Sequence, residues 1–318
     1  MNKNICVVGA GNWGKNHIRT LYKMNSLGAV VEPSKRRLSQ ILNKYQGIQG
    51  YSNITEATDK NFDGFIVATP AETHFKIAKE IIKSKFHLLI EKPMTLSVEE
   101  AEQLVIMAKE KKVNLMVGHV LLFHPAIKKI KDIIDNGSIG TLQYMYSNRL
   151  NLGKVRTEEN VFWSLAPHDI AIFQYLTNSY PININAQGSI ILQNNIFDST
   201  MTHFEYANGV KAHIFVSWLH PFKEHRLVFI GSEAMISFED SKEGKPLKLY
   251  SKKFDLNKGA PEKIDGPVTS IPYDNELALE SELKYFIEHC NNKKLNMSNG
   301  DHGLEVVRIL VEASKKLG

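Results

Sequence analysis

A histidine and an aspartate stand side by side at positions 168 and 169, within the stretch WSLAPHDI of residues 163–170. Proline is favoured in the first turn of a helix, so Pro167 predicts that His168 lies at a helix start, within reach of solvent or substrate. A histidine with an ordinary pKa of about 6.5 can exchange a proton near neutral pH. His168 is therefore a candidate acid/base; a metal ligand or a structural histidine are the alternatives.

A glycine motif near the N-terminus indicates what the chain binds. Gly9-Ala10-Gly11-Asn12-Trp13-Gly14 matches the G-x-G-x-x-G pattern, follows the apolar run ICVV and opens a helix. Gly9 permits the tight turn, Gly11 lets the backbone approach a pyrophosphate, and Gly14 lets the helix pack closely on the strand. A purely structural glycine turn is the alternative. We expect a dinucleotide whose pyrophosphate lies at the N-terminus of the helix.

An acidic residue in the right place suggests which dinucleotide. Glu32 ends the second predicted strand, about 20 residues after the glycine motif, where a carboxylate binds the ribose hydroxyls. A carboxylate there repels a 2′-phosphate, so NAD is expected and NADP is the less favoured cofactor. The basic residues 35–37 follow at once; they could tolerate NADP or simply form the solvated start of a helix.

The elements that must position these residues follow two patterns. Up to residue 120, apolar runs alternate with helical patterns, which predicts a doubly wound parallel sheet. Strands are expected within 4–11, 27–32, 62–70, 86–93 and 113–120. We therefore predict an α/β Rossmann domain over residues 1–120.

The second pattern begins after residue 120. A helix is expected within 122–137, and five strands within 141–150, 182–193, 198–207, 210–218 and 225–232. Asn208-Gly209 between two of them is a strong hairpin signal. One helix is expected over 163–177, an exposed edge or loop over 240–270, and two closing helices over 275–290 and 303–316. We predict an α+β domain with an open-faced antiparallel sheet over residues 121–318.

Composition narrows the classes of function. The 318 residues are 43% hydrophobic with a net charge of +5, which suits two globular domains and a small anionic substrate. No leader is recognised, and no apolar run approaches the roughly 20 residues of a membrane span. Scattered lysines without interleaved aromatics argue against nucleic-acid binding. Cys6 and Cys290 form no disulfide framework, so a reducing cytoplasm is expected; no compact metal-ligand cluster or G-x-S-x-G elbow is found.

The motifs in combination resemble the Gfo/Idh/MocA dehydrogenases. The resemblance rests on GAGNWG at 9–14, ATPAETH at 68–74, EKP at 91–93, GH at 118–119 and HD at 168–169, in this order. It implies that Lys92 of EKP lies beside the nicotinamide and the reacting hydroxyl, and that His168 is the acid/base. Lys92 acting alone as the base is an alternative. An X-Pro bond can be cis, and a cis bond at Pro93 would direct Lys92 toward the cleft.

The resemblance also implies the remaining contacts. The expected cofactor-binding residues are Gly9, Gly11, Asn12, Trp13, Gly14, Glu32, Ala68, Thr69, Pro70, His74, Glu91 and Lys92. The expected substrate-binding residues are Lys92, His119, Arg149, Arg156, Trp163 and His168. Many members carry an Asp four residues before the histidine, where this chain has Ser164. A strict carboxylate–histidine relay is therefore in doubt, and Asp169, on another face of the helix, is a poorer substitute.

Residues 148–170 resemble family members that oxidise nucleotide-linked N-acetyl sugars. Arg149, Lys154 and Arg156 would suit a diphosphate. We expect NAD-dependent oxidation of the 3-hydroxyl of a UDP-N-acetylhexosamine to a 3-keto sugar, which a pyridoxal-phosphate aminotransferase could consume. A 3-keto sugar-nucleotide reductase, an inositol or monosaccharide dehydrogenase, and a non-catalytic dinucleotide sensor are the alternatives. An open sheet face usually needs a partner, so a homodimer or homotetramer is expected.

Overall fold

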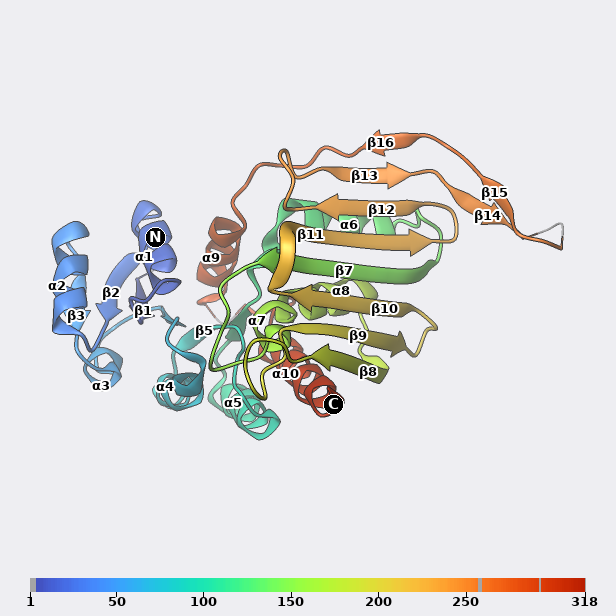
Figure 1. Cartoon of the computed structure of the whole chain (residues 1–318). Coiled ribbons are helices and arrows are strands. Elements are labelled where there is room, and N and C mark those ends of the chain that lie inside the picture. The colour runs from blue at the N-terminus through green and yellow to red at the C-terminus, as the bar shows by residue number, and fades with distance from the viewer. Residues whose placement is uncertain (1–3, 257–258, 292, 318) are drawn as a thin grey trace. The chain divides into compact units, whose positions relative to one another are not determined.

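Two units make up the chain in the computed structural model, which describes residues 4–256, 259–291 and 293–317 (Figure 1). Unit 1 comprises Met1–Phe123 and Glu276–Arg308, and unit 2 comprises His124–Asn275 and Ile309–Gly318. The sequence placed the boundary after residue 120 and assigned everything beyond it to the second domain. The chain instead returns to unit 1, because helix α9 (Ala278–His289) and the residue after it pack on the first sheet: Phe286 and Cys290 lie against Gly64.

The sheet of unit 1 is parallel, with strand order β3-β2-β1-β4-β5-β6. Its strands are β1 (Ile5–Val8), β2 (Leu27–Val31), β3 (Gln49–Tyr51), β4 (Gly64–Val67), β5 (His87–Glu91) and β6 (Leu115–Gly118). Its helices are α1 (Gly14–Lys23), α2 (Lys35–Lys44), α3 (Ile54–Thr58), α4 (Ala71–Lys83), α5 (Val98–Lys111), the 3-10 helix η1 (Val120–Phe123), α9 and the start of α10 (Gly300–Ser314). The predicted doubly wound sheet is confirmed; the sequence missed the short, exposed edge strand β3 and the short helices α3 and η1.

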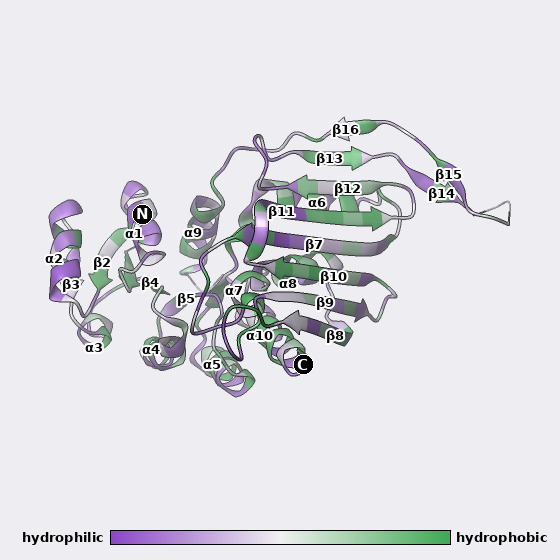
Figure 2. Ribbon diagram, viewed as in Figure 1, coloured by the Kyte–Doolittle hydropathy of each residue, from purple (hydrophilic) through white to green (hydrophobic). Residues whose placement is uncertain are grey.

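Local sequence explains why these elements form. Every residue of β1, β4, β5 and β6 is buried, as expected of strands covered by helices on both faces. The side chains of Ser34, Asn53 and Ser97 accept a hydrogen bond from a backbone N–H at the starts of α2, α3 and α5, which satisfies donors that a helix start leaves free. Helix α2 is hydrophilic along most of its length (Figure 2) and buries only Ile41.

The sheet of unit 2 has eight strands in the order β16-β13-β12-β11-β7-β10-β9-β8. Their bounds are β7 (Leu142–Leu152), β8 (Pro181–Ser189), β9 (Ser199–Tyr206), β10 (Lys211–Ser217), β11 (Leu219–Gly231), β12 (Met235–Glu239), β13 (Leu247–Tyr250) and β16 (Val268–Ser270); β14 (Lys253–Asp255) and β15 (Glu262–Ile264) pair separately. One central pair, β7 with β10, is parallel, so the sheet is mixed rather than wholly antiparallel. The polar stretch 240–270 contributes strands at the edge of this sheet.

Helices lie on one face of this sheet (Figure 1): α6 (Pro125–Asp135), α7 (Val161–Leu165) and α8 (Pro167–Thr177). Alternate residues such as Ala212 and Ile214 point toward that face and are buried, while their neighbours are more exposed. The predicted helix over 163–177 is two helices divided at Ala166. The predicted hairpin is confirmed: Gly209, at φ +84°, joins β9 to β10 in the left-handed conformation that glycine tolerates.

The described ranges contain no helix with the length and hydropathy of a membrane span. They also contain no group of three or more His, Cys, Asp or Glu side chains arranged to hold a metal ion.

Candidate active site

The glycine loop between β1 and α1 has the shape of a pyrophosphate site. A Cβ at Gly9 would lie 2.7 Å from the Ala68 carbonyl oxygen, and one at Gly14 would lie 2.1 Å from the carbonyl oxygen of Gly9. These two glycines are therefore required for the turn and for close packing of α1. A Cβ at Gly11 would meet no atom within 4 Å, so the loop leaves open space at the N-terminus of α1. This space and the backbone N–H groups beside it fit a dinucleotide pyrophosphate.

Glu32, directly after β2, is almost fully buried and holds the loop in place. Its Oε2 accepts from the backbone N–H of Ala10 at 3.1 Å, and its Oε1 accepts from the N–H of Ser34 at 2.9 Å and from Arg37 Nη2 at 2.7 Å. Burial opposes ionisation, but these three donors hold the pKa of Glu32 below its usual value. The carboxylate is thus available as an acceptor at the position where ribose hydroxyls bind. Arg37, whose side chain is half-exposed, is the basic residue of 35–37 that pairs with it.

The glutamate of the EKP motif joins three segments of unit 1. Glu91, at the end of β5, accepts from the indole N–H of Trp13 in the glycine loop and from His17 Nε2 on α1, the latter at 2.6 Å. Its other oxygen accepts from the backbone N–H of Lys92 at 3.3 Å. A Cβ at Gly118 would lie 3.0 Å from this carboxyl group, which explains why a glycine ends β6. Trp13 and Glu91 were predicted as cofactor contacts, and the structure also shows them bonded to each other.

The Lys92–Pro93 peptide bond is cis, as the sequence suggested. His74, on α4, is bonded to the turn at Lys92–Pro93. Its Nδ1 lies 2.9 Å from the carbonyl oxygen of Pro93, and its Nε2 lies 2.9 Å from that of Thr69. Burial lowers the pKa of His74, although both carbonyls favour the protonated ring. His74 was predicted to bind the cofactor; in the structure it fastens the turn that carries Lys92 to the loop after β4.

His119, directly after β6, is a buried histidine whose ring feels the positive charge of Lys92. Its ring meets that of His302 edge-on, with centroids 5.5 Å apart. Burial, with smaller contributions from His302 and Lys92, lowers the pKa of His119 well below the usual value. Neither ring nitrogen has a hydrogen-bond partner among the described residues. The imidazole is therefore neutral and keeps both a donor and an acceptor for another molecule.

In unit 2, His168 lies in the first turn of α8 and is half-buried. Pro167 is the first residue of that helix, as predicted. Ser164 lies on α7, which precedes the break at Ala166, so the segment is not one continuous helix that would stack Ser164 on His168. The indole N–H of Trp163 donates to Ser314 Oγ at 2.8 Å. This bond anchors α7 to the C-terminal end of α10 in the same unit.

The structure gives Arg149 a different role from the one expected. Arg149, on β7, donates from Nε and Nη2 to the two carboxylate oxygens of Asp169, both at 2.8 Å, and both side chains are buried. This bidentate pair neutralises the guanidinium and commits two of its donor nitrogens. Arg149 is therefore a poor candidate for binding a diphosphate. Asp169, in turn, faces this arginine, so it does not take the place of the aspartate that many family members carry at the position of Ser164.

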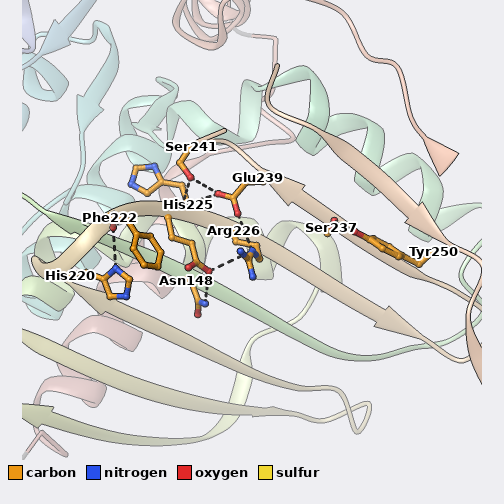
Figure 3. Close-up of polar contacts among 10 residues, drawn as sticks. Asn148, His220, Phe222, His225, Arg226, Ser237, Glu239, Ser241 and Tyr250 are labelled. Atoms are coloured by element: carbon orange, nitrogen blue, oxygen red, sulfur yellow. Dashed lines mark hydrogen bonds and ion pairs between the residues drawn. The ribbon is translucent and has the colours of Figure 1, made fainter. Parts of the chain in front are cut away.

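His225, on β11, lies beside that ion pair. Its Nδ1 is 3.5 Å from Arg149 Nη1, and burial, together with the charge of Arg149, lowers the pKa of His225 to about 4. Its backbone N–H is held by Glu239, which also accepts from Arg226 Nε at 2.9 Å; Figure 3 shows Arg226 and Ser241 turned toward this carboxylate. His225 is thus a fixed, neutral imidazole near neutral pH.

Two predicted cations remain exposed. Lys154 and Arg156 lie between β7 and α7. The carbonyl oxygen of Arg156 accepts from Gln193 Nε2 at 2.8 Å, and the charge of Arg156 lowers the pKa of the exposed Glu158, after the hydrogen bonds of that group. Both side chains are accessible to an anionic group. They are better placed for a phosphate than the buried Arg149.

The predicted residues thus divide between the units. Unit 1 holds the glycine loop, Glu32, the loop 68–70, His74, the EKP turn and His119; unit 2 holds Arg149, Arg156, Trp163 and His168. The sequence did not single out His17, His225 or His302. Only His17 had a local signal, since it lies one helical turn after Trp13; the others come from segments far away in the chain.

Comparisons with known proteins agree with this architecture. Residues 3–119 match the model "Oxidoreductase family, NAD-binding Rossmann fold" of the Gfo/Idh/MocA proteins, and residues 127–237 match the Gfo/Idh/MocA C-terminal domain. The UDP-N-acetylglucosamine 3-dehydrogenase of Acidithiobacillus ferrooxidans is 26% identical over 316 residues, covering 96% of each chain. The scyllo-inositol 2-dehydrogenase (NAD(+)) of Bacillus subtilis is 27% identical over 248 residues, covering 72% of each.

Solved structures share the fold. The structure of UDP-N-acetylglucosamine 3-dehydrogenase GnnA from Acidithiobacillus ferrooxidans has a TM-score of 0.88 at 22% identity, over 100% of this chain and 98% of that one. GenD2 from gentamicin A biosynthesis, in complex with NAD, has a TM-score of 0.82 at 20% identity, over 99% and 94%.

Proposed function

Because the chain belongs to the Gfo/Idh/MocA family of NAD-binding oxidoreductases, we propose that it oxidises the 3-hydroxyl of UDP-N-acetylglucosamine. The products would be the 3-keto sugar nucleotide, NADH and a proton. The observation that carries the proposal is the similarity to a UDP-N-acetylglucosamine 3-dehydrogenase over nearly the full length of both chains. That similarity extends through the second unit, which holds four of the predicted substrate residues: Arg149, Arg156, Trp163 and His168.

Bound NAD would supply the hydride acceptor for the carbon that carries the hydroxyl. The open space at Gly11 and the carboxylate of Glu32 suit its pyrophosphate and adenosine ribose, respectively. In this proposal Glu32 selects NAD over NADP by repelling a 2′-phosphate.

Lys92 is assigned to the reacting hydroxyl. Glu91 accepts from the backbone N–H of Lys92, and His74 is bonded to the carbonyl oxygen of Pro93. The side chain of Lys92 therefore extends from a backbone segment that is held in place. An ammonium or amine group can hydrogen-bond the hydroxyl and stabilise the negative charge that develops on oxygen. The neutral His119 near it is assigned to hydrogen bonding with the substrate.

His168 is assigned to accept the proton of the hydroxyl. It lies at the start of α8, half-buried, next to an Asp169 that is fixed by Arg149. A partly accessible histidine at such a position can act as a general base. Trp163 is assigned to the sugar-binding wall, and Lys154 and Arg156 to the diphosphate.

A second candidate keeps the same residues but changes the substrate. The similarity to scyllo-inositol 2-dehydrogenase (NAD(+)) favours an inositol or a free monosaccharide. The sugar-nucleotide reading is preferred, because that similarity covers a smaller share of each chain and because the exposed Lys154 and Arg156 suit a diphosphate, which inositol lacks.

The test is direct. Purified protein is incubated with NAD and either UDP-N-acetylglucosamine, UDP-glucose, myo-inositol or glucose, and NADH formation is followed by its absorbance. Substrate carrying deuterium at C3 should transfer the deuterium to NAD, which mass spectrometry detects. Turnover of inositol or glucose, with none of any nucleotide sugar, would reject the proposal in favour of the second candidate.

Two partners belong to this proposal. Oxidation of an alcohol by NAD is unfavourable near neutral pH, so a pyridoxal-phosphate aminotransferase that consumes the ketone would pull the reaction forward. The open face of the second sheet is assigned to another copy of the chain. This face carries a hollow of about 310 Å³ whose lining mixes apolar side chains (Tyr146, Val228, Met235 and Tyr250) with charged ones (Arg226, Glu239, Lys242 and Lys248). A mixed lining of this kind suits a symmetric contact, in which the same patch meets its own copy.

A further inference from the structure

The loop that joins β8 to β9 exposes three consecutive apolar side chains. Ile190 is 47% exposed, Ile191 is 63% exposed and Leu192 is 52% exposed. Single exposed apolar residues are normal on a protein surface, whereas a run of three is unfavourable in water unless it has a function. None of the residues assigned to the proposed reaction lies in this run, so its role is still to be explained.

A buried carboxylate holds the backbone of this apolar run in place. Asp198 is 0% exposed, and its Oδ2 accepts from the N–H groups of Ile191 and Leu192, both at 2.8 Å. Its Oδ1 accepts from the indole N–H of Trp218 at 2.6 Å. Burial opposes the ionisation of Asp198, but these three donors hold its pKa below the usual value. Because the run is held through its backbone N–H groups, these bonds do not depend on its side chains.

The same loop borders the segment that carries the exposed cations (Figure 1). Gln193, the residue after the apolar run, donates from Nε2 to the carbonyl oxygen of Arg156 at 2.8 Å. The carbonyl oxygen of Phe197 accepts from the N–H of Val161, the first residue of α7, at 3.0 Å. The loop and the segment that leads into α7 are thus tied at two points, both within unit 2.

These groups follow one another in unit 2 in the order of the parts of a sugar nucleotide. His168 begins α8, Trp163 lies on the preceding helix α7, and Arg156 lies before α7. In the proposed function they serve the reacting hydroxyl, the sugar ring and the diphosphate, respectively. The apolar run comes next, beside the backbone of Arg156. In a sugar nucleotide the part that continues from the diphosphate is the nucleoside, whose base has flat faces that pack on side chains.

We propose that Ile191 and Leu192 contact the face of the nucleobase of the sugar nucleotide while Arg156 holds its diphosphate. Aliphatic side chains that cover the face of a pyrimidine remove apolar surface from water. They cannot hydrogen-bond the edge of the base, so they favour a nucleotide-linked sugar over a free sugar phosphate without choosing among pyrimidines. The identity of this ligand rests on the proposed function, whereas the exposed run and its anchoring do not.

Three substitutions isolate the apolar contact. Ile191→Ser and Leu192→Ser remove the apolar side chains but keep the N–H groups that donate to Asp198. Ile182→Ser is the matched control, because Ile182 is 72% exposed and lies at the other end of β8. Ile191→Thr, which keeps the branched shape at Cβ, replaces the serine variant if that variant does not fold.

The first measurement is calorimetric titration of the protein saturated with NADH, so that the dinucleotide site is filled. The ligands are UDP and N-acetylglucosamine 1-phosphate, which carries the sugar and a phosphate but no base. The Kd for UDP should rise about 4- to 15-fold in I191S and in L192S, as expected when one or two CH2 groups lose an apolar contact. The Kd for the sugar phosphate should stay close to that of wild type, and I182S should match wild type with both ligands.

Binding of UDP needs no turnover, so the titration separates this proposal from the proposed function. If UDP binds through the loop but UDP-N-acetylglucosamine is not oxidised, only the proposed function falls. Three results would overturn the role of the loop: wild-type affinity for UDP in I191S and L192S, no binding of UDP by wild type, or an equal loss of affinity for both ligands.

The second measurement tests whether the apolar run instead meets another copy of the chain. The mass of the double variant I191S/L192S, measured by light scattering, should equal that of wild type. A smaller mass would assign the run to a contact between copies and reject the nucleobase as its occupant.

Discussion

At the scale of single residues, Glu32 and Arg37 together should decide the choice of cofactor. Glu32→Ala removes the acceptor for the ribose hydroxyls and also releases Arg37 from its bond to the carboxylate. Loss of a charged hydrogen bond is worth about 1.5–3 kcal/mol, so kcat/KM for NAD should fall roughly 10- to 150-fold. The freed Arg37 can pair with a 2′-phosphate, so activity with NADP should rise.

The double variant Glu32→Ala/Arg37→Ala is the control for this prediction. It should lose NAD activity to the same extent as Glu32→Ala but show no gain with NADP. Steady-state kinetics with both cofactors measure this. Equal use of NAD and NADP by the unmodified protein would contradict a selective role for Glu32.

His168 should contribute to proton transfer and not to the stability of the fold. It is only half-buried at the start of α8, and the ion pair that stabilises this region belongs to its neighbour Asp169. His168→Asn should lower turnover about 10²- to 10⁴-fold, the usual cost of removing a general base. The Tm and the Kd for NAD should stay close to those of wild type, as measured by calorimetry and by NAD titration. A large loss of Tm with normal turnover of the folded fraction would assign His168 to the fold.

At the scale of elements, the Arg149–Asp169 pair should hold α8 on the sheet. Removing one partner of a buried ion pair typically costs about 3–5 kcal/mol, because the other charge remains buried. Arg149→Ala should lower the free energy of unfolding by roughly that amount in urea titrations. The double variant Arg149→Met/Asp169→Leu should recover much of it, since apolar side chains of similar volume replace buried pairs at little cost.

Arg156→Ala is the comparison that separates binding from stability. Arg156 is exposed, so its removal should leave the free energy of unfolding nearly unchanged and raise the KM for the UDP-sugar more than that for NAD. If Arg149→Ala instead left stability intact and raised only the KM for the sugar nucleotide, the sequence-based assignment of Arg149 to the diphosphate would be restored.

At the scale of the whole molecule, the open face of the second sheet should join copies of the chain. Val228 on β11 lines the hollow on this face, between Tyr146 of β7 and Ser237 of β12, its partners on the neighbouring strands. A charge placed there is costly to bury in an interface. Light scattering should find a dimer or tetramer for the unmodified protein, and Val228→Glu should shift it toward the monomer. Ile106→Glu, at an exposed position of α5, is the control and should leave the mass unchanged; a monomeric unmodified protein would refute the assignment.

The sequence by itself determined most of unit 1. Gly9 and Gly14 are needed for the turn and the close packing of α1, and Gly11 leaves open space for a ligand. Fully buried strands separated by single helices leave few alternatives to a doubly wound sheet. Pro93 only permitted a cis bond, which most X-Pro sequences do not adopt. The hairpin at Gly209 was predictable, because it depends on the pair Asn208-Gly209. Turns and backbone conformations of this kind depend on interactions between residues a few positions apart, so the local sequence is enough to predict them.

Only the tertiary structure decided which charges meet. Arg149 reads as a surface cation until β7 and α8 bring it against Asp169, 20 residues away. Glu282 has the sequence context of an ordinary helix residue, and only the return of α9 to the first unit buries it completely. The pKa of a group and the partner of an ion pair depend on burial and on distances between segments remote in sequence. For that reason the chemistry of these residues follows from the fold and not from their spacing in the chain.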